Sequence, residues 1–225
     1  VSQGGLGLDT RDYYLSDDAQ NKRIMEAYKA YLKKLFLMTG NDEAAAEKKM
    51  QAVINIETRI AKASYDRVKL RDIEANYHKM TYAQLINDFP GIDWGNVFLA
   101  SGFPAFDYVD VGQPEPIHEV EKILAEASLD DLKSYAEAKV IGGATSVLGD
   151  EFRKVSFELS SVMTGVKEDR PRWKRAVGLV SGTLGEAIGK LYVEKYFPES
   201  SKKRMLELVH NLQTALGQRI DGLAW

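Results

Sequence analysis

The sequence predicts a mostly α-helical protein: a multi-helix, bundle-like lobe with at most one or two short strands near residues 104–112. Two observations lead to this prediction. Apolar side chains recur every three or four residues through most of the 225-residue chain, which is the spacing of helices with one buried face. One segment instead alternates apolar and polar residues as a strand does, FDYVDVG from Phe106 to Gly112. We expect one helical domain over residues 1–225, because the chain has no repeat, low-complexity tract or Ser/Gly-rich linker.

Two long helices are expected before residue 65. Ser16 is the expected N-cap of the first helix, with acidic residues in the turn after it, and Gly40 is the expected stop. A second helix is expected from about Asn41. The apolar positions that define the two stripes are Ile24, Ala27, Tyr28, Tyr31, Leu35 and Met38 in the first, and Ala45, Ala52, Val53, Ile56 and Ile60 in the second.

Two short helices are expected between residues 81 and 101. Thr81 and Gln84 have the spacing of a capping box, in which each side chain bonds to the other residue's backbone N–H. The turn sequence FPG, residues 89–91, should close the helix that this box opens. Asp93 is then the expected cap of a helix that begins at Trp94.

Helices are expected to resume after the strand. Ile117, Val120, Ile123 and Leu124 share one face of the first of them. Ser128 and Asp131 repeat the capping-box spacing and open a helical region that extends to about Gly165. A break is expected in this region near residues 142–143 or at Gly149, because a glycine inside a helix costs roughly 1 kcal/mol.

The last quarter of the chain predicts two more helices, the first from Arg172 to Tyr196. It carries a stripe of glycines on one side: Gly178, Gly182, Gly185 and Gly189. We interpret this stripe as close backbone contact between two crossing helices rather than a cofactor-facing groove, because it lacks the strand and turn of a nucleotide loop. The second helix is expected to run to the end of the chain, with its apolar stripe still in progress at Trp225.

Composition excludes several classes of function. The formal net charge of −3 argues against nucleic acid as a partner, because phosphate binding needs a clustered excess of Lys and Arg. No apolar run reaches the roughly 18 residues needed to cross a bilayer. Cysteine is absent, so disulfides, thiolate metal sites and cysteine nucleophiles are excluded. The chain begins at Val1 with no basic-then-apolar leader, so we expect a processed or excised piece.

The residues offer no self-contained catalytic or metal site. HEVEK at His118 begins like a zinc-protease helix, but the second imidazole must follow four residues later, and Lys122 stands there. The other two histidines, His78 and His210, are far away in sequence. Neither a G-x-S-x-G elbow nor a G-x-G-x-x-G loop is present. We therefore expect no catalytic, cofactor-binding or metal-ligating residue in this chain.

Three stretches carry a resemblance to a known family. LGLDTRDYY from Leu6 to Tyr14, YHKMTYAQL from Tyr77 to Leu85, and RWKRAVGLVSGTLGEAIGKLYVEKYF from Arg172 to Phe197 resemble signatures of the neprilysin-like (M13) zinc metallopeptidases, in the family's order. ETRIAKAS and IDGLAW are similar to further segments of the family. Asp9 replaces the usual proline, and Ala176 falls where the family often has cysteine. The absence of cysteine suggests a bacterial-type member, similar to oligopeptidase O.

The resemblance implies that the chain is part of a zinc enzyme and lacks the residues that hold the zinc and catalyse the reaction. The family holds zinc with an H-E-x-x-H helix and a later E-x-x-x-D glutamate, all beyond the region matched here. Glu186 cannot replace that glutamate, because Lys190 rather than Asp follows it. The chain is then much of the helical lobe that caps the catalytic zinc domain of the same polypeptide and admits oligopeptides but excludes folded proteins.

Further expectations follow for the parent protein. It is expected in the periplasm, outside the cell or anchored to the cell envelope, with the cytoplasm as the alternative. The chain alone should bind no zinc and cleave no peptide, and an exposed apolar patch could make it self-associate. The competing hypothesis is a free-standing helical module that binds a protein or peptide partner.

The opening stretch has an expected role of its own. Gly5 and Gly7 would let the backbone turn ahead of the first long helix. Arg11 and Asp12 would bridge neighbouring elements through charge-assisted hydrogen bonds. The rings of the tyrosine pair at 13–14 would be buried while their hydroxyls reach polar partners. We therefore predict a structural joint, with substrate contact as the alternative.

Overall fold

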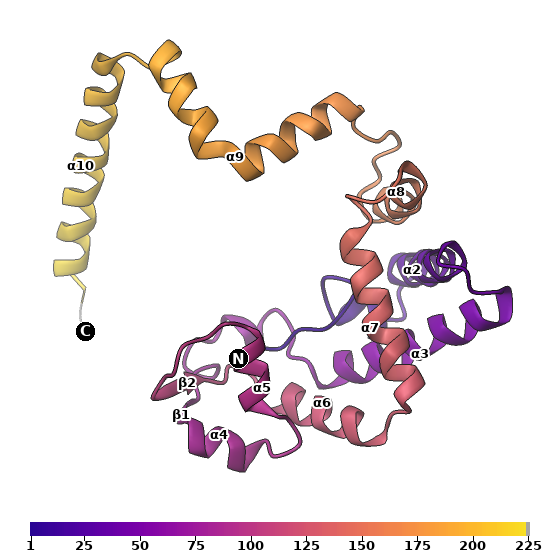
Figure 1. Ribbon diagram of the computed structural model, residues 1–225. Helices are drawn as coiled ribbons and strands as arrows, with labels where there is room; N and C mark the ends of the chain where they lie inside the picture. The colour runs from indigo at the N-terminus through magenta and orange to yellow at the C-terminus, as the bar shows by residue number, and fades with distance from the viewer. Residues whose placement is uncertain (224–225) are drawn as a thin grey trace. The chain divides into compact units, whose positions relative to one another are not determined.

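The structure is a computed structural model that describes residues 1–223, and it is mostly α-helical, as predicted. Its contacts divide the chain into two compact units, unit 1 (Val1–Glu168) and unit 2 (Asp169–Trp225) (Figure 1). Strands among the described residues are limited to one two-stranded sheet. None of the described helices is both long enough and apolar enough to span a membrane.

Unit 1 begins with a short helix followed by the two long helices that the sequence predicted. These are α1 (Asp12–Leu15), α2 (Ala19–Met38) and α3 (Glu43–Ala63). The cap of α2 is Asp18 and not Ser16. The Asp18 carboxylate accepts from the N–H groups of Gln20 and Asn21, whereas the Ser16 hydroxyl donates to Asp18. A carboxylate is a stronger acceptor than a hydroxyl at the positive end of a helix. Helix α2 therefore begins two residues later than predicted.

The region from Ser128 to Gly165 forms two helices, α7 (Leu129–Ala144) and α8 (Asp150–Thr164). The break between them covers residues 145–149, at the predicted place. Gly165 ends α8 with a φ of +76°, a left-handed conformation that suits glycine. Helices α7 and α8 pack against α2 and α3 to form the main core of unit 1, whose buried members include Leu32, Phe36 and Val53.

A smaller module occupies residues 65–126. It contains the 3₁₀ turn η1 (Lys69–Arg71), strands β1 (Lys79–Thr81) and β2 (Tyr108–Asp110), and helices α4 (Tyr82–Asp88), α5 (Trp94–Ala100) and α6 (Pro114–Glu126). The strands pair antiparallel with Met80 opposite Val109. Strand β2 lies in the segment expected to be extended, whereas β1 was missed, because three residues are too few to show a period of two. The module has its own apolar cluster around Leu85, Phe89 and Trp94.

Three predicted caps are confirmed, two in this module and one at the start of α7. Thr81 and Gln84 form the complete capping box at the start of α4. The Asp93 carboxylate accepts from the N–H of Asn96 at the start of α5. The Ser128 hydroxyl accepts from the N–H of Asp131 at the start of α7. Local side-chain chemistry thus fixed these three helix starts.

Unit 2 consists of α9 (Arg172–Tyr196) and α10 (Glu199–Asp221), neither of which has a buried residue. Helix α9 has its predicted bounds but contains a kink, because Leu184 has a non-helical φ of −119° and ψ of 23°. Within unit 2, a Cβ added at Gly178, Gly182, Gly185 or Gly189 would meet no described atom within 4 Å. The expected contact of a crossing helix along this glycine stripe therefore stays a prediction.

Helix α10 does not run to the end of the chain. It ends at Asp221, and the Gly222 N–H bonds to the carbonyl of Arg219. The predicted end of this helix is therefore wrong, because Gly222 acts as the C-cap. Trp225 lies outside the described residues.

Candidate functional site

The N-terminal stretch is attached to a buried carboxylate. Glu57 on α3 has a side-chain exposure of 0 %. Its Oε1 accepts from the Tyr28 hydroxyl at 3.2 Å and from the Lys139 Nζ at 2.6 Å, and its Oε2 accepts from the Tyr14 hydroxyl at 2.8 Å. Helices α1, α2, α3 and α7 each supply one of these residues. We call the four residues, Tyr14, Tyr28, Glu57 and Lys139, the Glu57 hub.

The hub holds the backbone of the glycine-rich loop. The Tyr14 oxygen accepts from the N–H groups of Gly7 at 3.2 Å and Leu8 at 3.0 Å while its proton goes to Glu57. Leu8 is buried in the main core. Gly7 is required for space, because a Cβ at this position would lie 1.8 Å from the Tyr28 oxygen. The loop can approach the hub this closely only without a side chain at residue 7.

The electrostatics of the hub keep its phenols protonated. Burial, followed by the negative charge of Glu57, raises the pKa of Tyr14 and of Tyr28 far above the usual value. The same two causes raise the pKa of Tyr135 to about 12. Protonated phenols can donate to the carboxylate, and the Lys139 ammonium balances its charge. A buried carboxylate is tolerated only with such partners.

Arg11 joins the same stretch to the far end of α3. Its Nη1 donates to the Ser64 carbonyl at 2.6 Å, at the C-terminal end of the helix, where a positive charge is favourable. The Tyr13 ring packs partly buried against the main core. Asp12 bonds only locally, to the hydroxyl of Thr10. The predicted joint is therefore confirmed for Arg11 and Tyr14, whereas the predicted bridge from Asp12 is wrong, because its neighbour Thr10 satisfies the carboxylate.

The first residues are fixed by a second set of contacts that no sequence pattern indicated. The Gln3 side chain accepts from the Tyr65 N–H at 2.7 Å and donates to the Tyr65 carbonyl at 3.2 Å. The Gln3 N–H donates to the side chain of Gln113 at 2.9 Å. Gln113 lies more than a hundred residues away, and isolated glutamines have no sequence pattern that could reveal such a pairing.

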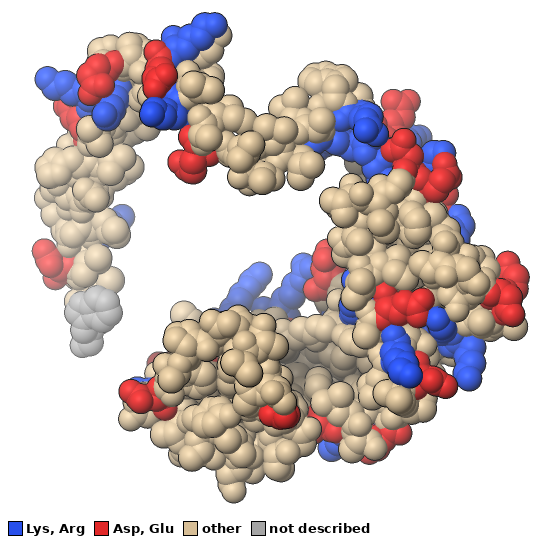
Figure 2. All heavy atoms as spheres, viewed as in Figure 1, with Lys and Arg blue, Asp and Glu red and all other residues tan. Residues whose placement is uncertain are grey.

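An apolar groove of about 440 Å³ opens beside these residues in unit 1. Its floor lies between the cluster around Trp94 and a third apolar cluster of Ile56, Ile60 and Ile123. Figure 2 shows unit 1 hollowed in this part of its surface, with tan rather than red or blue atoms in the hollow. The groove is lined by residues 1–5 and by Ile56, Ile60, Ile92, Trp94, Val97, Pro116, Ile117, Val120, Ile123, Leu124, Leu132 and Tyr135.

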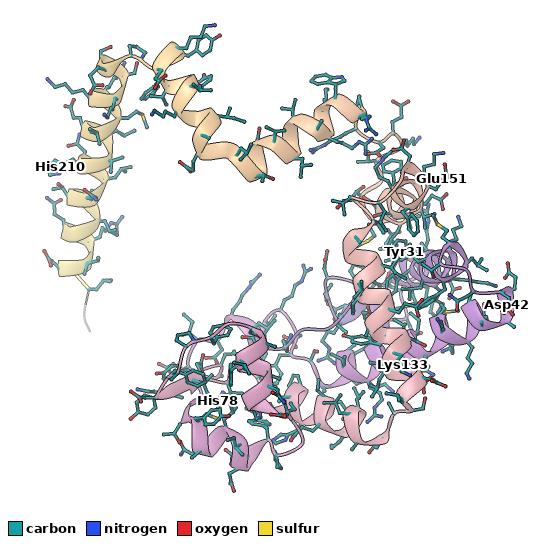
Figure 3. The ribbon with its side chains drawn as sticks, viewed as in Figure 1. Tyr31, Asp42, His78, Lys133, Glu151 and His210 are labelled. Atoms are coloured by element: carbon teal, nitrogen blue, oxygen red, sulfur yellow. The ribbon has the colours of Figure 1, made fainter. Side chains whose placement is uncertain are left out.

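The three histidines lie at separate elements. His78 precedes β1 and bonds to the Val111 carbonyl, whereas His210 lies on α10 (Figure 3). His118 pairs with Glu121 and packs its ring against Phe89. Among residues 1–223, no three His, Cys, Asp or Glu side chains are grouped so that they could hold a metal ion.

Comparison with known proteins relates the whole chain to one group. The profile of "Peptidase family M13", for its N-terminal part, matches residues 1–225. Endothelin-converting enzyme 1 is 31% identical in Homo sapiens and 30% in Rattus norvegicus, over all of this chain and 30% of the relative's length. The chain thus spans about a third of these relatives.

Solved structures are similar to this chain over nearly its full length. The Mycobacterium tuberculosis zinc metalloprotease Zmp1 in complex with an inhibitor superposes with a TM-score of 0.85 at 32% identity, over the full chain and 34% of Zmp1. PepO of Lactobacillus rhamnosis has the same fold, with a TM-score of 0.80 at 16% identity, over 97% of this chain and 35% of PepO. With the profile match over its full length, the chain belongs to peptidase family M13 and forms an N-terminal domain of that family's zinc metallopeptidases.

Proposed function

We propose that this chain is the non-catalytic helical lobe of a zinc metalloendopeptidase that hydrolyses oligopeptides. The observation that carries the proposal is the profile match over residues 1–225 together with the coverage of only a third of the relatives. The rest of the polypeptide would supply the catalytic zinc domain. There, zinc would activate a water molecule and a glutamate would act as general base.

Both units would belong to one lobe that caps the active-site cavity and limits substrate size. In unit 1, the Glu57 hub fixes the glycine-rich loop rigidly against the core, as a wall of a chamber requires. In unit 2, the apolar stripe of α10 is exposed, which suits a helix that packs against another part of the parent. The stripe consists of Met205, Leu208, Val209, Leu212, Leu216 and Ile220. The parent's place would be the periplasm, the extracellular space or the cell envelope, with the cytoplasm as the alternative.

The test compares the parent with the isolated chain. We expect the purified parent to hold one zinc ion and to cleave a fluorogenic oligopeptide in a chelator-sensitive way. We expect the isolated chain to hold no stoichiometric zinc by elemental analysis and to cleave nothing. Zinc-dependent cleavage by the isolated chain, or an H-E-x-x-H motif missing from the coding sequence beyond Trp225, would refute the proposal.

The size limit needs its own measurement. The same cleavable sequence should be offered as a short peptide, as a longer peptide and within a loop of a folded protein. We expect the parent to cleave the peptides and to leave the folded protein intact. Equal cleavage of all three would refute the size limit and the capping role. The proposed zinc-dependent hydrolysis would not be affected.

A free-standing interaction module is the second candidate, and the apolar groove of unit 1 favours it. A module of this kind would be stable and monomeric without further sequence. Sedimentation of the isolated chain therefore separates the two candidates, because an excised lobe should associate through α9 and α10.

A further inference from the structure

We propose that the groove of unit 1 and the extended residues 1–5 beside it form a docking site for an extended, uncharged peptide segment with apolar side chains. We call residues 1–5 the strap. The inference takes the class of ligand, a peptide, from the proposed function. It adds a place on this chain at which such a peptide is held, and the side chains that the place selects.

The strap is paired with β2 along one side. The α-ammonium group of Val1 donates to the Asp110 carbonyl at 2.6 Å, and the Gly112 N–H donates to the Val1 carbonyl at 2.8 Å. This is the bonding pattern of a parallel strand pair. The Gln3 N–H continues on the same side, toward Gln113. These bonds place the start of the strap along β2.

The opposite side of the strap is open. Backbone groups alternate in direction along an extended chain, so the N–H and C=O groups of Ser2 and Gly4 face away from β2. Within residues 1–223, these groups have no hydrogen-bond partner, and both residues are exposed. A Cβ at Gly4 would meet nothing within 4 Å, so another backbone can approach. An exposed edge of this kind binds a peptide by adding it as a strand.

The groove beside this edge determines which side chains fit. None of the lining side chains is charged, and the α-ammonium group of Val1 already donates to the Asp110 carbonyl. Ile60 and Ile123 are buried in the floor, whereas Val97 and Leu124 at the rim are 42 % and 47 % exposed. A charged side chain would lose its hydration here without gaining a partner, so the groove complements an uncharged, apolar one. Its volume of about 440 Å³ lies within the range of roughly 300–1,000 Å³ typical of ligand pockets.

Trp94 in the groove provides a direct probe. The chain has three tryptophans, so replacing Trp173 and Trp225 by Phe leaves Trp94 as the single reporter. The ligand is an acetylated and amidated hexapeptide with leucine at alternate positions and uncharged polar residues between them. We expect a saturable change in Trp94 fluorescence with this peptide. A peptide with glutamate in place of each leucine should produce none.

Two matched pairs of variants test the two parts of the site. Gly4→Pro removes one outward N–H, whereas Gly4→Ala keeps it. Val97→Glu places a charge at the rim, whereas Val140→Glu places one at a site on α7 that is 72 % exposed and outside the groove. We expect Gly4→Pro and Val97→Glu each to weaken binding at least tenfold. The two controls should bind as the unsubstituted chain does, and circular dichroism verifies that all four variants fold.

The outcomes are decisive. Absence of saturable binding, or equal weakening by Val97→Glu and Val140→Glu, overturns the docking site. Zinc-dependent peptide cleavage is measured separately on the parent. A parent that cleaves peptides alongside a chain that binds none rejects this inference alone, whereas an inactive parent alongside a chain that binds the hexapeptide rejects the proposed function alone.

Discussion

Glu57 connects α3 to three other helices of unit 1 through its hydrogen bonds to Tyr14, Tyr28 and Lys139. It keeps a negative charge in the interior because two phenols and one ammonium group direct protons at it. Removing the carboxylate charge leaves those donors with a weaker acceptor and Lys139 without its counterion. The Lys139 side chain is 34 % exposed, so it can turn toward water and recover part of the loss.

Glu57→Gln is therefore expected to lower the free energy of unfolding by about 2 kcal/mol, less than the roughly 3–5 kcal/mol of a fully buried pair. Urea denaturation measures this. Glu137→Gln is the control, because Glu137 pairs with Lys49 near the surface and such pairs contribute about 0–1 kcal/mol. Equal effects of the two substitutions would contradict a special role for the hub.

Arg11→Ala tests the other anchor of the stretch. It removes the charged donor to the Ser64 carbonyl, and a hydrogen bond of this class contributes roughly 1.5–3 kcal/mol when well buried. We expect the melting temperature to fall by roughly 2–4 °C for each kcal/mol lost in a chain of this size. Lys22→Ala serves as the control, because Lys22 forms only an exposed pair with Asp17. An unchanged melting temperature would refute the joint.

At the scale of elements, glycine has opposite roles in the two units. In unit 1, Gly7 lies against the hub, where a side chain has no room. In α9, a Cβ at the stripe glycines would meet no described atom within 4 Å, and each glycine lowers the helix propensity of the segment. The same residue type is thus a packing requirement in unit 1 and a cost in helix propensity in α9.

Alanine substitutions separate these roles. Gly7→Ala should destabilise the chain by about 2 kcal/mol or more, because its Cβ would overlap the Tyr28 oxygen and disrupt the hub. Gly178→Ala should stabilise α9 by roughly 0.5–1 kcal/mol through helix propensity. Thermal unfolding followed by circular dichroism measures both. Destabilisation of the isolated chain by Gly178→Ala would show that something does pack closely against the stripe.

At the scale of the whole molecule, the two units differ in how much they bury. Unit 1 has a main core and two smaller apolar clusters, whereas neither helix of unit 2 has a buried residue. Apolar faces of this extent are typical of surfaces that another chain or domain covers. Unit 2 should therefore determine how the isolated chain behaves in solution.

We expect the isolated chain to self-associate, with a mass in sedimentation equilibrium that increases with concentration. Replacing Leu208 and Leu212 by Glu should return it toward a monomer, because two charges would interrupt the α10 stripe. Lys203→Glu with Gln213→Glu, on the same helix, adds acidic residues outside the stripe and should change little. A chain that is monomeric at every concentration would contradict this expectation.

The sequence by itself determined the secondary structure and the family. Helix starts at Thr81, Asp93 and Ser128 were predictable because a cap is a local interaction between residues three apart. The break after Ala144 and the bounds of α9 were also predictable, because they too depend on residues that are close together in the sequence. Strand β1 and the end of α10 were not, because three-residue strands and single glycine caps produce too weak a local pattern.

Only the tertiary structure decided the site. Glu57, Lys139 and Gln113 look ordinary in the sequence, and their roles depend on partners 29 to 110 residues away. Burial makes Glu57, an ordinary residue in the sequence, the acceptor that fixes the N-terminal loop. The packing of the strap beside β2 leaves one side of the strap paired and the other side open. Interactions between distant residues depend on how the helices pack, and packing sums many weak contacts that no short stretch of sequence encodes.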